Sequence, residues 1–354
     1  MVSGRLQSTI MSRVLSFALH LCATLSCCQA FLHTKLGFLP QKATFKRQFA
    51  SSPSATPLPT RTENSVFERH FEKKDSTKNP VLTYLEINGW IMTINGMTLL
   101  VDPILEGPLD FGIPAVYKAT KRVLPTTGLI QPNNCDWLDK IDALVLTQGL
   151  DDHAHVKTLN KLGSISKFAN RIPVVAPPSA KPALEGAGFP TSNLKFLNHG
   201  QSLKLRNQEE PSLDLLATKG ALVGPPWQAR ENGYIIKGGD FSLYIEPHAE
   251  FDANELQQNS PVDLVISPIV GQQINTPLVP FELVHGPRDT ERIVEILKPK
   301  YLVPMMNGNV DTEGPLSKVV SEIGSAEEFR RNNNRLQTVQ IIDAQPGEPL
   351  EIKR

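Results

Sequence analysis

The chain has 354 residues, enough for one large domain or two medium ones, and carries 36 Lys and Arg against 36 Asp and Glu. Seven of the basic residues and none of the acidic ones lie in residues 1–62, which leaves 29 basic and 36 acidic residues in the rest of the chain. A mildly acidic body argues against nucleic acid as the main partner, because phosphate binding requires a net basic face.

The cysteines are unevenly placed along the chain. Cys22, Cys27 and Cys28 lie within the first thirty residues, and only Cys135 lies beyond them. An intramolecular disulfide in the body of the protein is therefore impossible. This distribution fits a reducing compartment, or one that is indifferent to thiols.

Residues 1–30 have the order of a secretory signal peptide. Two arginines precede an apolar run from Val14 to Leu25, and small residues follow up to Ala30. The run is too short for a permanent membrane-spanning helix, and no later run is long and apolar enough to cross a bilayer. We therefore predict a cleaved signal peptide and no membrane span in the mature protein.

Residues 31–62 have the composition of a transit peptide: they are rich in Ser, Thr and Pro, contain five basic residues and lack acidic ones. With Phe31 directly after Ala30, the two segments together resemble the bipartite presequence of algae with secondary plastids. We expect the mature protein in the plastid stroma. The alternative is plain secretion with a pro-segment.

Residues 63–79 are charged and end before a proline, which indicates a linker or a helix that leads into the domain. We expect the folded domain over residues 80–354. It opens with three β-rich runs, at residues 81–87, 90–94 and 97–101, which are separated by Asn-Gly pairs. Asn-Gly between apolar runs is a strong hairpin signal, so the pattern predicts an opening β-meander.

Strands and helices alternate through the rest of the domain. Residues 103–135 are rich in Pro and Gly and are typical of a long loop or lid. Further strands are predicted at residues 141–147, 173–176, 203–205, 213–217, 234–236, 243–245, 264–266, 301–304 and 337–342, and helices at residues 156–168, 178–187, 287–297, 316–323 and 326–332. This order suits two sheets packed face to face with helices outside, an α/β fold of the αββα sandwich type.

Four segments, taken in order, carry a family resemblance. They are LTYLEINGWIMTINGMTLLVDPIL, IDALVLTQGLDDHAHVKTLNKL, ENGYIIKGGDFSLYIEPH and KPKYLVPMMNGN, which together run from Val81 to Asn309. The set resembles the metallo-β-lactamase superfamily in its lactonase-like branch. It is most similar to plastid proteins of plants and algae that share the DDHAH, GPPW and EPH words. The resemblance implies the metallo-β-lactamase fold.

The hydrolases of that family bind two zinc or iron ions through a His-x-His-x-Asp-His loop, two further histidines and a bridging Asp. Such ions convert bound water to hydroxide near neutral pH. Aligned with this pattern, Gln148 and Leu150 replace the first two histidines, and Met306 replaces the last. The middle histidine falls near Val223 or Gly224. The resemblance therefore implies a degenerate site, because leucine cannot bind a metal and methionine is a weak ligand for zinc.

Three residues remain that could hold one ion: Asp152 and His153, which keep their family positions, and His248, which aligns with the bridging Asp. We predict at most one zinc or iron ion on these three residues, or none. The structural alternative is that Asp152 caps the following helix with its carboxylate and His153 is a neutral, hydrogen-bonded imidazole. For His248 the alternative is a hydrogen-bonded residue at a strand end.

Three further residues are candidates for substrate binding. Glu246 could orient His248 or act as a base. Trp227, in the stiff GPPW loop, could form a pocket wall or a core plug. His155 follows His153 by two residues, and only a loop would let both face one ion. His199 and His285 are expected to be structural.

Two functions follow from this pattern. The first is a diverged hydrolase of the plastid that acts on a small-molecule ester, lactone or phosphoester, with Asp152, His153 and His248 as catalytic residues. The second is a non-catalytic binding or scaffold protein that keeps the fold and binds a protein partner. The loss of ligands favours the second function, and the survival of Asp152-His153 favours the first.

Overall fold

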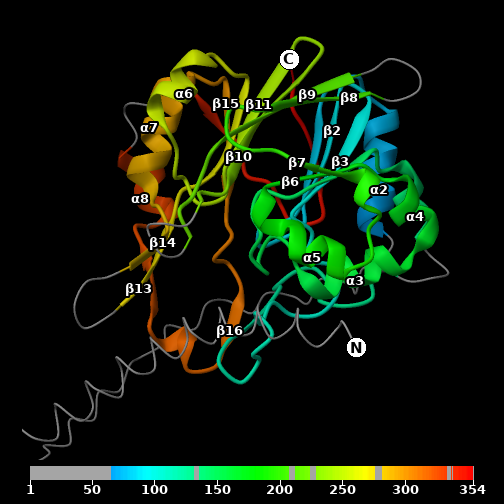
Figure 1. The fold of residues 1–354 in the computed structure, drawn as a ribbon. Helices are drawn as coiled ribbons and strands as arrows, with labels where there is room; N and C mark the ends of the chain where they lie inside the picture. The colour runs from blue at the N-terminus through cyan, green and yellow to red at the C-terminus, as the bar shows by residue number, and fades with distance from the viewer. Residues whose placement is uncertain are drawn as a thin grey trace, which may run out of the picture. The chain divides into compact units, whose positions relative to one another are not determined.

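The computed structural model describes residues 65–130, 135–206, 212–223, 229–275, 281–332, 336 and 338–353 (Figure 1). The predictions for the presequence and for Trp227 fall outside these residues. Within the described parts of the chain, none of the helices is both long enough and apolar enough to cross a bilayer.

Two seven-stranded sheets form the body of the protein. The first contains, from edge to edge, β19 (Pro349–Glu351), β1 (Val81–Tyr84), β2 (Trp90–Ile94), β3 (Met97–Val101), β5 (Ala143–Val145), β6 (Val174–Ala176) and β7 (Leu194–Phe196). The second contains β18 (Gln340–Ile341), β15 (Tyr301–Met305), β12 (Leu264–Pro268), β11 (Phe241–Ile245), β10 (Asn232–Gly238), β9 (Ser212–Lys219) and β8 (Ser202–Arg206).

A continuous apolar core lies between the sheets. Trp90 and Met92 of β2 belong to the same buried cluster as Ile236 of β10 and Leu243 of β11. Burial of this kind contributes roughly 25 cal/mol for each Å² of apolar surface removed from water. Because the core is built from hydrocarbon, we expect the fold not to depend on a metal for its stability.

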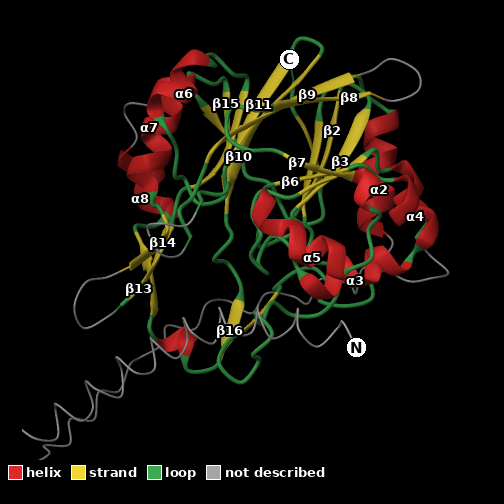
Figure 2. Cartoon of the chain, viewed as in Figure 1, coloured by secondary structure: helices red, strands yellow, loops and turns green. Residues whose placement is uncertain are grey.

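Helices cover the outer face of each sheet, as Figure 2 shows in red. The first sheet is covered by α2 (Ser65–Asp75), α3 (Val156–Ser164), α4 (Ser166–Arg171) and α5 (Lys181–Gly186), and the second by α6 (Ala253–Gln258), α7 (Pro287–Leu297) and α8 (Ala326–Asn332). Short 3₁₀ turns lie at η1 (Asp136–Lys140), η2 (Pro178–Ala180), η3 (Thr191–Asn193) and η4 (Leu316–Lys318). This arrangement confirms the αββα sandwich.

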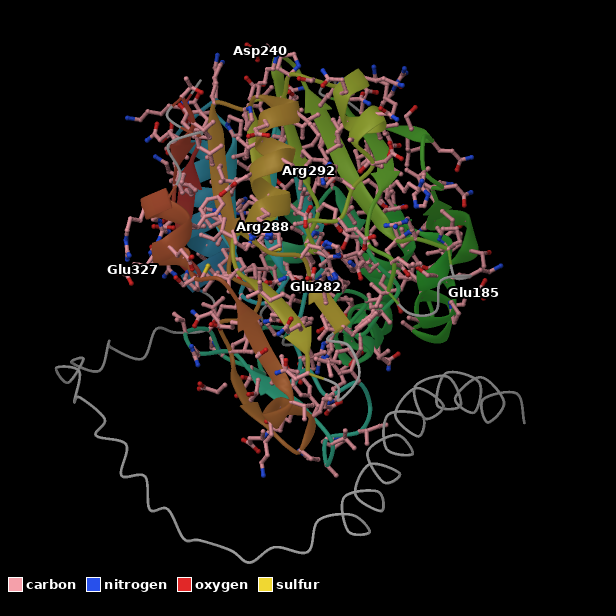
Figure 3. All side chains as sticks on the ribbon, turned by 90° about the vertical axis from the view of Figure 1, so that its left-hand side faces the viewer. Glu185, Asp240, Glu282, Arg288, Arg292 and Glu327 are labelled. Carbon is pink, nitrogen blue, oxygen red and sulfur yellow. The ribbon has the colours of Figure 1, made fainter. Side chains whose placement is uncertain are left out.

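Helix α7 shows how the amphipathic pattern fixes this layering. Its Ile293 and Leu297 are buried against the second sheet, whereas Arg288 and Arg292 are exposed along the outer side of the helix (Figure 3). Apolar residues spaced by four positions share one face of a helix. The predicted bounds of this helix, residues 287–297, match the structure.

The segment at residues 63–79 contains a packed helix, so the helical alternative to a linker is the one the structure shows. Phe67 of α2 stacks on Trp137 with ring centroids 3.7 Å apart. His70, also on α2, makes hydrogen bonds of 2.8 and 2.9 Å to the hydroxyl groups of Thr83 and Thr93. The helix is therefore part of the folded domain.

The helix predicted at residues 316–323 is wrong. Residues Leu316–Lys318 form η4, and Val320–Ile323 form the strand β17. This strand pairs with β13 (Gly271–Ile274), which also pairs with β14 (Phe281–Val284). Sheet partners far away in sequence satisfy the backbone of β17, and they override the local helical pattern.

The predicted loop at residues 103–135 also contains one short strand, β4 (Lys118–Thr120), which pairs with β16 (Asp311–Glu313). The loop connects β3 to η1. The helix predicted at residues 156–168 is interrupted at Ile165, where α3 ends and α4 begins.

Candidate metal centre

The three residues predicted to hold an ion meet where strands from the two sheets end. Asp152 and His153 lie in the turn between β5 and α3, and His248 lies three residues after β11. Backbone N–H groups of His153 and Ala154 both donate to the carbonyl of Leu150, which closes the turn. The sandwich thus brings together side chains that are about one hundred residues apart in sequence.

The ligand atoms of these residues converge on one point. Nε2 of His153 lies 3.2 Å from Nε2 of His248 and 3.3 Å from Oδ2 of Asp152, and the three ligand atoms lie within 4.8 Å of one another. Zinc bonds of roughly 2.0–2.1 Å in tetrahedral geometry place neighbouring ligand atoms about 3.3 Å apart. The spacing therefore fits a single ion.

His153 is oriented from behind by a buried carboxylate. Its Nδ1 lies 2.8 Å from Oδ2 of Asp102 and 3.0 Å from the hydroxyl group of Thr147. Thr147 also donates its backbone N–H to Asp102 over 2.8 Å and its hydroxyl over 2.5 Å. Because Nδ1 donates to Asp102, Nε2 is the nitrogen that faces His248 and Asp152. A carboxylate behind a histidine is the usual support of a metal ligand.

Glu246 holds the loop that carries His248. Its Oε2 accepts the backbone N–H groups of His248 over 3.0 Å and of Glu250 over 2.8 Å. The loop turns at Ala249, which has a left-handed φ of 55°. Burial raises the pKa of Glu246 to about 8, although these two N–H groups oppose the shift. Of the two roles predicted for Glu246, orienting His248 or acting as a base, these contacts fit the first, and they act through the backbone of His248.

Four carboxyl groups surround this point. Asp102, Glu231 and Glu246 are buried, and Asp152 is largely enclosed. Burial raises the pKa of Glu231. Although burial alone would lower the pKa of His153, the carboxylates of Asp152 and Asp102 raise it to about 10. The carboxylates of Asp152 and Asp102 thus favour a positive charge at this point, because unpaired buried charge is costly.

Unpartnered oxygen atoms strengthen the fit to an ion. Oδ1 of Asp152 and Oδ1 of Asn88 are buried, and neither has a hydrogen-bond partner among the described residues. The amide nitrogen of the same Asn88 lies 3.0 Å from the carbonyl of Asp152 and 3.2 Å from Nε2 of His153. Buried polar atoms without partners in a native fold commonly mark a missing water or ion.

Comparison with known families identifies the domain. A family model described as a beta-lactamase superfamily domain matches residues 81–306, which is more than half of the chain. The chain belongs to the beta-lactamase superfamily. A comparison with curated proteins gave no match.

Solved structures of several hydrolases share the fold of this domain. A metallo hydrolase from the archaeon Ignicoccus hospitalis is 15% identical, with a TM-score of 0.52 over 78% of this chain and 99% of its own. A possible metal-dependent hydrolase from Veillonella parvula is 16% identical, with a TM-score of 0.53 over 77% and 100%. An isothiocyanate hydrolase from Delia radicum gut bacteria is 18% identical, with a TM-score of 0.50 over 77% and 100%.

The family resemblance aligned Met306, Leu150 and Gln148 with metal-ligand positions, and the structure gives their surroundings. Met306 packs against the apolar cluster between the second sheet and its helices. Leu150 contributes its backbone carbonyl to the turn. Gln148 is fully buried, and neither end of its amide has a partner in the part of the chain that the structure describes.

The structural alternative for Asp152 is wrong. The backbone N–H at the start of α3, that of Val156, donates to Asp151 over 2.9 Å, whereas the carboxylate of Asp152 faces His153. Although burial opposes the shift, the charge of His153 holds the pKa of Asp152 below its usual range. His153 is buried and hydrogen-bonded, as the alternative required, and the carboxylates of Asp152 and Asp102 raise its pKa.

The other histidines are not part of the triad. His155 is buried, and its Nδ1 makes a hydrogen bond of 2.8 Å to Thr158. His199 bonds through Nε2 to the carbonyls of two residues before β10. His285 lies 3.1 Å from Asp289, and this contact raises its pKa. The expectation that His199 and His285 are structural agrees with these contacts.

Sequence reasoning missed several residues of the site. Asp102 was not singled out, and Asn88 entered only as part of a hairpin signal. Their position directly after β-rich runs was the available signal, because strand ends in a sandwich gather at one edge. Thr147 and Glu231 offered no signal of that kind. All four residues lie at the same end of the sandwich as the triad.

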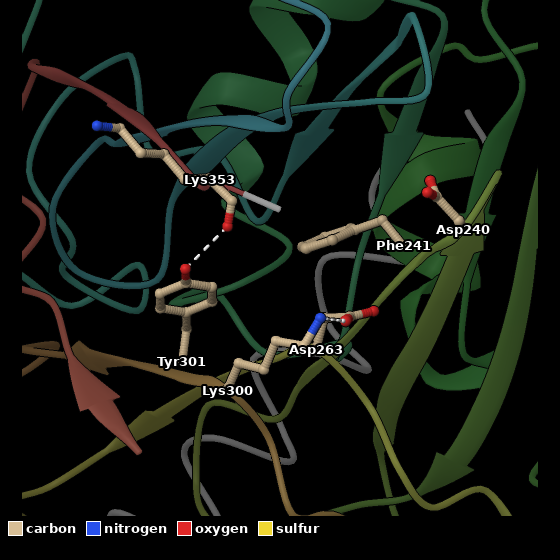
Figure 4. A pocket seen from close by; sticks show the side chains of 6 residues that line it. All are labelled: Asp240, Phe241, Asp263, Lys300, Tyr301 and Lys353. Atoms are coloured by element: carbon tan, nitrogen blue, oxygen red, sulfur yellow. Dashed lines mark hydrogen bonds and ion pairs between the residues drawn. The ribbon is translucent and has the colours of Figure 1, made fainter. Parts of the chain in front are cut away.

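A small cavity lies at the opposite end of the second sheet (Figure 4). It has a volume of about 60 Å³ and is lined by Asp240, Phe241, Asp263, Lys300, Tyr301 and Lys353. Lys353 follows β19, and the other five residues stand at the beginning of β11, β12 and β15, whereas His248 follows the end of β11. The Lys300–Asp263 ion pair of 3.2 Å and the hydrogen bond from the Tyr301 hydroxyl to the Lys353 carbonyl line this cavity. The cavity is therefore separate from the metal centre.

Proposed function

We propose that the protein is a metal-dependent hydrolase of the plastid whose degenerate site holds one zinc or iron ion on Asp152, His153 and His248. One observation supports this proposal most directly. Nε2 of His248 lies 3.2 Å and Oδ2 of Asp152 lies 3.3 Å from Nε2 of His153. Three protein ligands leave one position open for water or substrate, as in catalytic zinc sites.

A bound ion would supply a hydroxide nucleophile near neutral pH. The chain's own residues hold the ligands in place: Asp102 and Thr147 fix the ring of His153, and Glu246 fixes the loop of His248. Tyr117, from the long loop after β3, lies close to Asp152. Burial raises the pKa of Tyr117 to about 12, and the Asp152 carboxylate contributes to this rise. This loop would shape the pocket for an ester, lactone or phosphoester.

We expect the purified full-length chain to hold at most one transition-metal ion. Leu150 has no ligand atom in its side chain, and Met306 packs in an apolar cluster, so the first metal position lacks its ligands. The protein should also stay folded when chelator removes the ion, because its core is apolar. Elemental analysis gives the metal content, and circular dichroism gives the fold. Two tightly bound ions per chain would disprove the assignment of ligands.

The second candidate is a scaffold protein, and the replacement of ligands by Gln148, Leu150 and Met306 favours it. Such a protein would bind its partner equally well with and without metal. A His153→Ala variant would keep partner binding and lose only stability, by about 1–3 kcal/mol for one buried polar contact. Loss of hydrolysis together with loss of the ion in this variant would exclude the scaffold function.

We also propose delivery to the plastid by the bipartite presequence at residues 1–62. Fusion of this segment to a fluorescent protein should direct it to the plastid of an alga with secondary plastids. Phe31→Ala should divert the fusion to the endomembrane system, because the aromatic residue would stand first after signal cleavage at Ala30. Fluorescence microscopy locates the fusion, and Phe38→Ala is the matched control. Plastid import that is unaffected by Phe31→Ala would contradict this role.

A further inference from the structure

A buried amide from the first hairpin reaches the candidate metal centre. Asn88, in the turn between β1 and β2, is 2% exposed. Its Nδ2 lies 3.0 Å from the backbone carbonyl oxygen of Asp152 and 3.2 Å from Nε2 of His153. A carbonyl oxygen only accepts hydrogen bonds, so the contact with Asp152 fixes the nitrogen end of the amide at this place. The amide therefore presents its N–H₂ group to the ligand atoms.

The N–H₂ group of Asn88 has two hydrogens and one lasting acceptor. The carbonyl of Asp152 accepts one hydrogen, and the other is left with Nε2 of His153. Because Nδ1 of His153 is directed at Asp102, Nε2 is the nitrogen that holds the ion in the proposed function. Its lone pair is then used, and the second N–H of Asn88 has no acceptor within the described residues. A buried donor without an acceptor is costly, so this N–H requires an oxygen atom from a ligand.

The distances place this N–H beside the ion position. Nδ2 of Asn88 lies as far from Nε2 of His153 as Nε2 of His248 does, 3.2 Å in each case. Neighbouring atoms around a tetrahedral zinc ion are separated by about 3.3 Å. Solvent reaches the cluster at Asp152, whose side chain is 19% exposed and whose carbonyl accepts from Asn88. A molecule that enters from this side therefore meets the ion position and the amide together.

We propose that Asn88 is the oxyanion donor of this site, and that its second N–H binds the carbonyl or phosphoryl oxygen of the substrate. When water adds to an ester carbonyl, the electron pair of the C=O bond moves onto this oxygen, and the N–H donates to it. The carbonyl forms again as the alcohol leaves with a proton of the attacking water. A donor that is fixed before the reaction stabilises such charge without reorganisation. This inference rests on the proposed function.

The test uses the full-length chain loaded with cobalt(II), a coloured substitute for zinc, and titrates it with inorganic phosphate. Phosphate offers negatively charged oxygens to the open position, and visible absorption follows its binding. We expect Asn88→Ala to keep its cobalt and to raise the Kd for phosphate at least about tenfold, the loss for one hydrogen bond to a charged group. Asn88→Leu keeps the volume of the side chain and should give the same result. On an ester that the wild type hydrolyses, kcat should fall about 10²–10³-fold with KM little changed.

Asn307→Ala is the matched control. Nδ2 of Asn307 donates over 3.0 Å to the carbonyl of Pro247, directly before His248, just as Asn88 donates to the carbonyl of Asp152. It makes no hydrogen bond to a ligand nitrogen in the part of the chain that the structure describes. Asn307→Ala should therefore leave the Kd for phosphate unchanged, and thermal melting shows what the loss of either amide costs the fold.

Four results would overturn the role of Asn88 as oxyanion donor. They are equal phosphate affinity in the wild type and Asn88→Ala, an equal loss in Asn88→Ala and Asn307→Ala, no phosphate binding by the cobalt-loaded wild type, and loss of cobalt from Asn88→Ala. A wild-type chain that binds no cobalt would refute the proposed function and this inference together. A chain that binds cobalt and phosphate as expected but hydrolyses no ester, lactone or phosphoester would refute the hydrolase and retain Asn88 as an anion donor.

Discussion

Replacement of either His153 or His248 with alanine is expected to abolish metal binding and any hydrolysis together. Each residue supplies one of three converging ligand atoms, and their Nε2 atoms lie 3.2 Å apart. Two remaining ligands do not hold a zinc or iron ion tightly, whereas the usual two-metal site of the family, with about six ligands, tolerates the loss of one better. Metal content by elemental analysis and activity on an ester, lactone and phosphoester panel are the measurements.

His199→Ala and His285→Ala are the matched controls. Both remove a partly exposed imidazole from the same domain. His199 bonds to backbone carbonyls, and His285 contacts Asp289. Neither ring belongs to the cluster of ligand atoms. Both variants should keep the ion and the activity. A His248→Ala protein that keeps metal and activity would show that His248 does not occupy the bridging position, and the hydrolase proposal would lose its main support.

The sequence predicted the sandwich because most of its strands and helices carry strong local signals. The hairpin at Asn95-Gly96 is one example: the flanking runs at residues 90–94 and 97–101 coincide with β2 and β3, and both turn residues have left-handed φ values. The triad was also accessible, because Asp152 and His153 keep a family spacing. What brings His248 to them is the packing of one sheet on the other, which no local pattern specifies.

The parts that sequence analysis missed depend on partners far away in the chain. The strand β17 forms because β13 pairs with it, not because its own four residues favour a strand. The roles of Asp102 and Thr147 emerge only when β3 and β5 lie side by side, which places both residues behind His153.

Asp102 supplies the other large effect that we expect. The conservative change Asp102→Asn should lower metal affinity by about 10–100-fold, the usual cost of losing the partner behind a metal-bound histidine. Oδ2 of Asp102 receives both His153 Nδ1–H and the Thr147 hydroxyl. In asparagine, an N–H₂ group replaces one of the two carboxylate oxygens. If it replaces Oδ2, it faces these two donors; if it replaces Oδ1, it faces the backbone N–H of Thr147. In either case two hydrogen-bond donors face each other. The ring of His153 then loses its fixed orientation.

The backbone should not obscure this result, because asparagine tolerates a left-handed φ as well as aspartate does, and Asp102 has a φ of 41°. Asp142→Asn is the matched control. Asp142 accepts the backbone N–H of Thr98 over 2.7 Å at the start of β5, the end of that strand away from the site. Competition with a coloured chelator measures the affinity of each variant for zinc. If Asp102→Asn binds zinc as tightly as Asp142→Asn and the wild type do, and only its melting temperature falls, then Asp102 stabilises the fold without tuning His153 for metal.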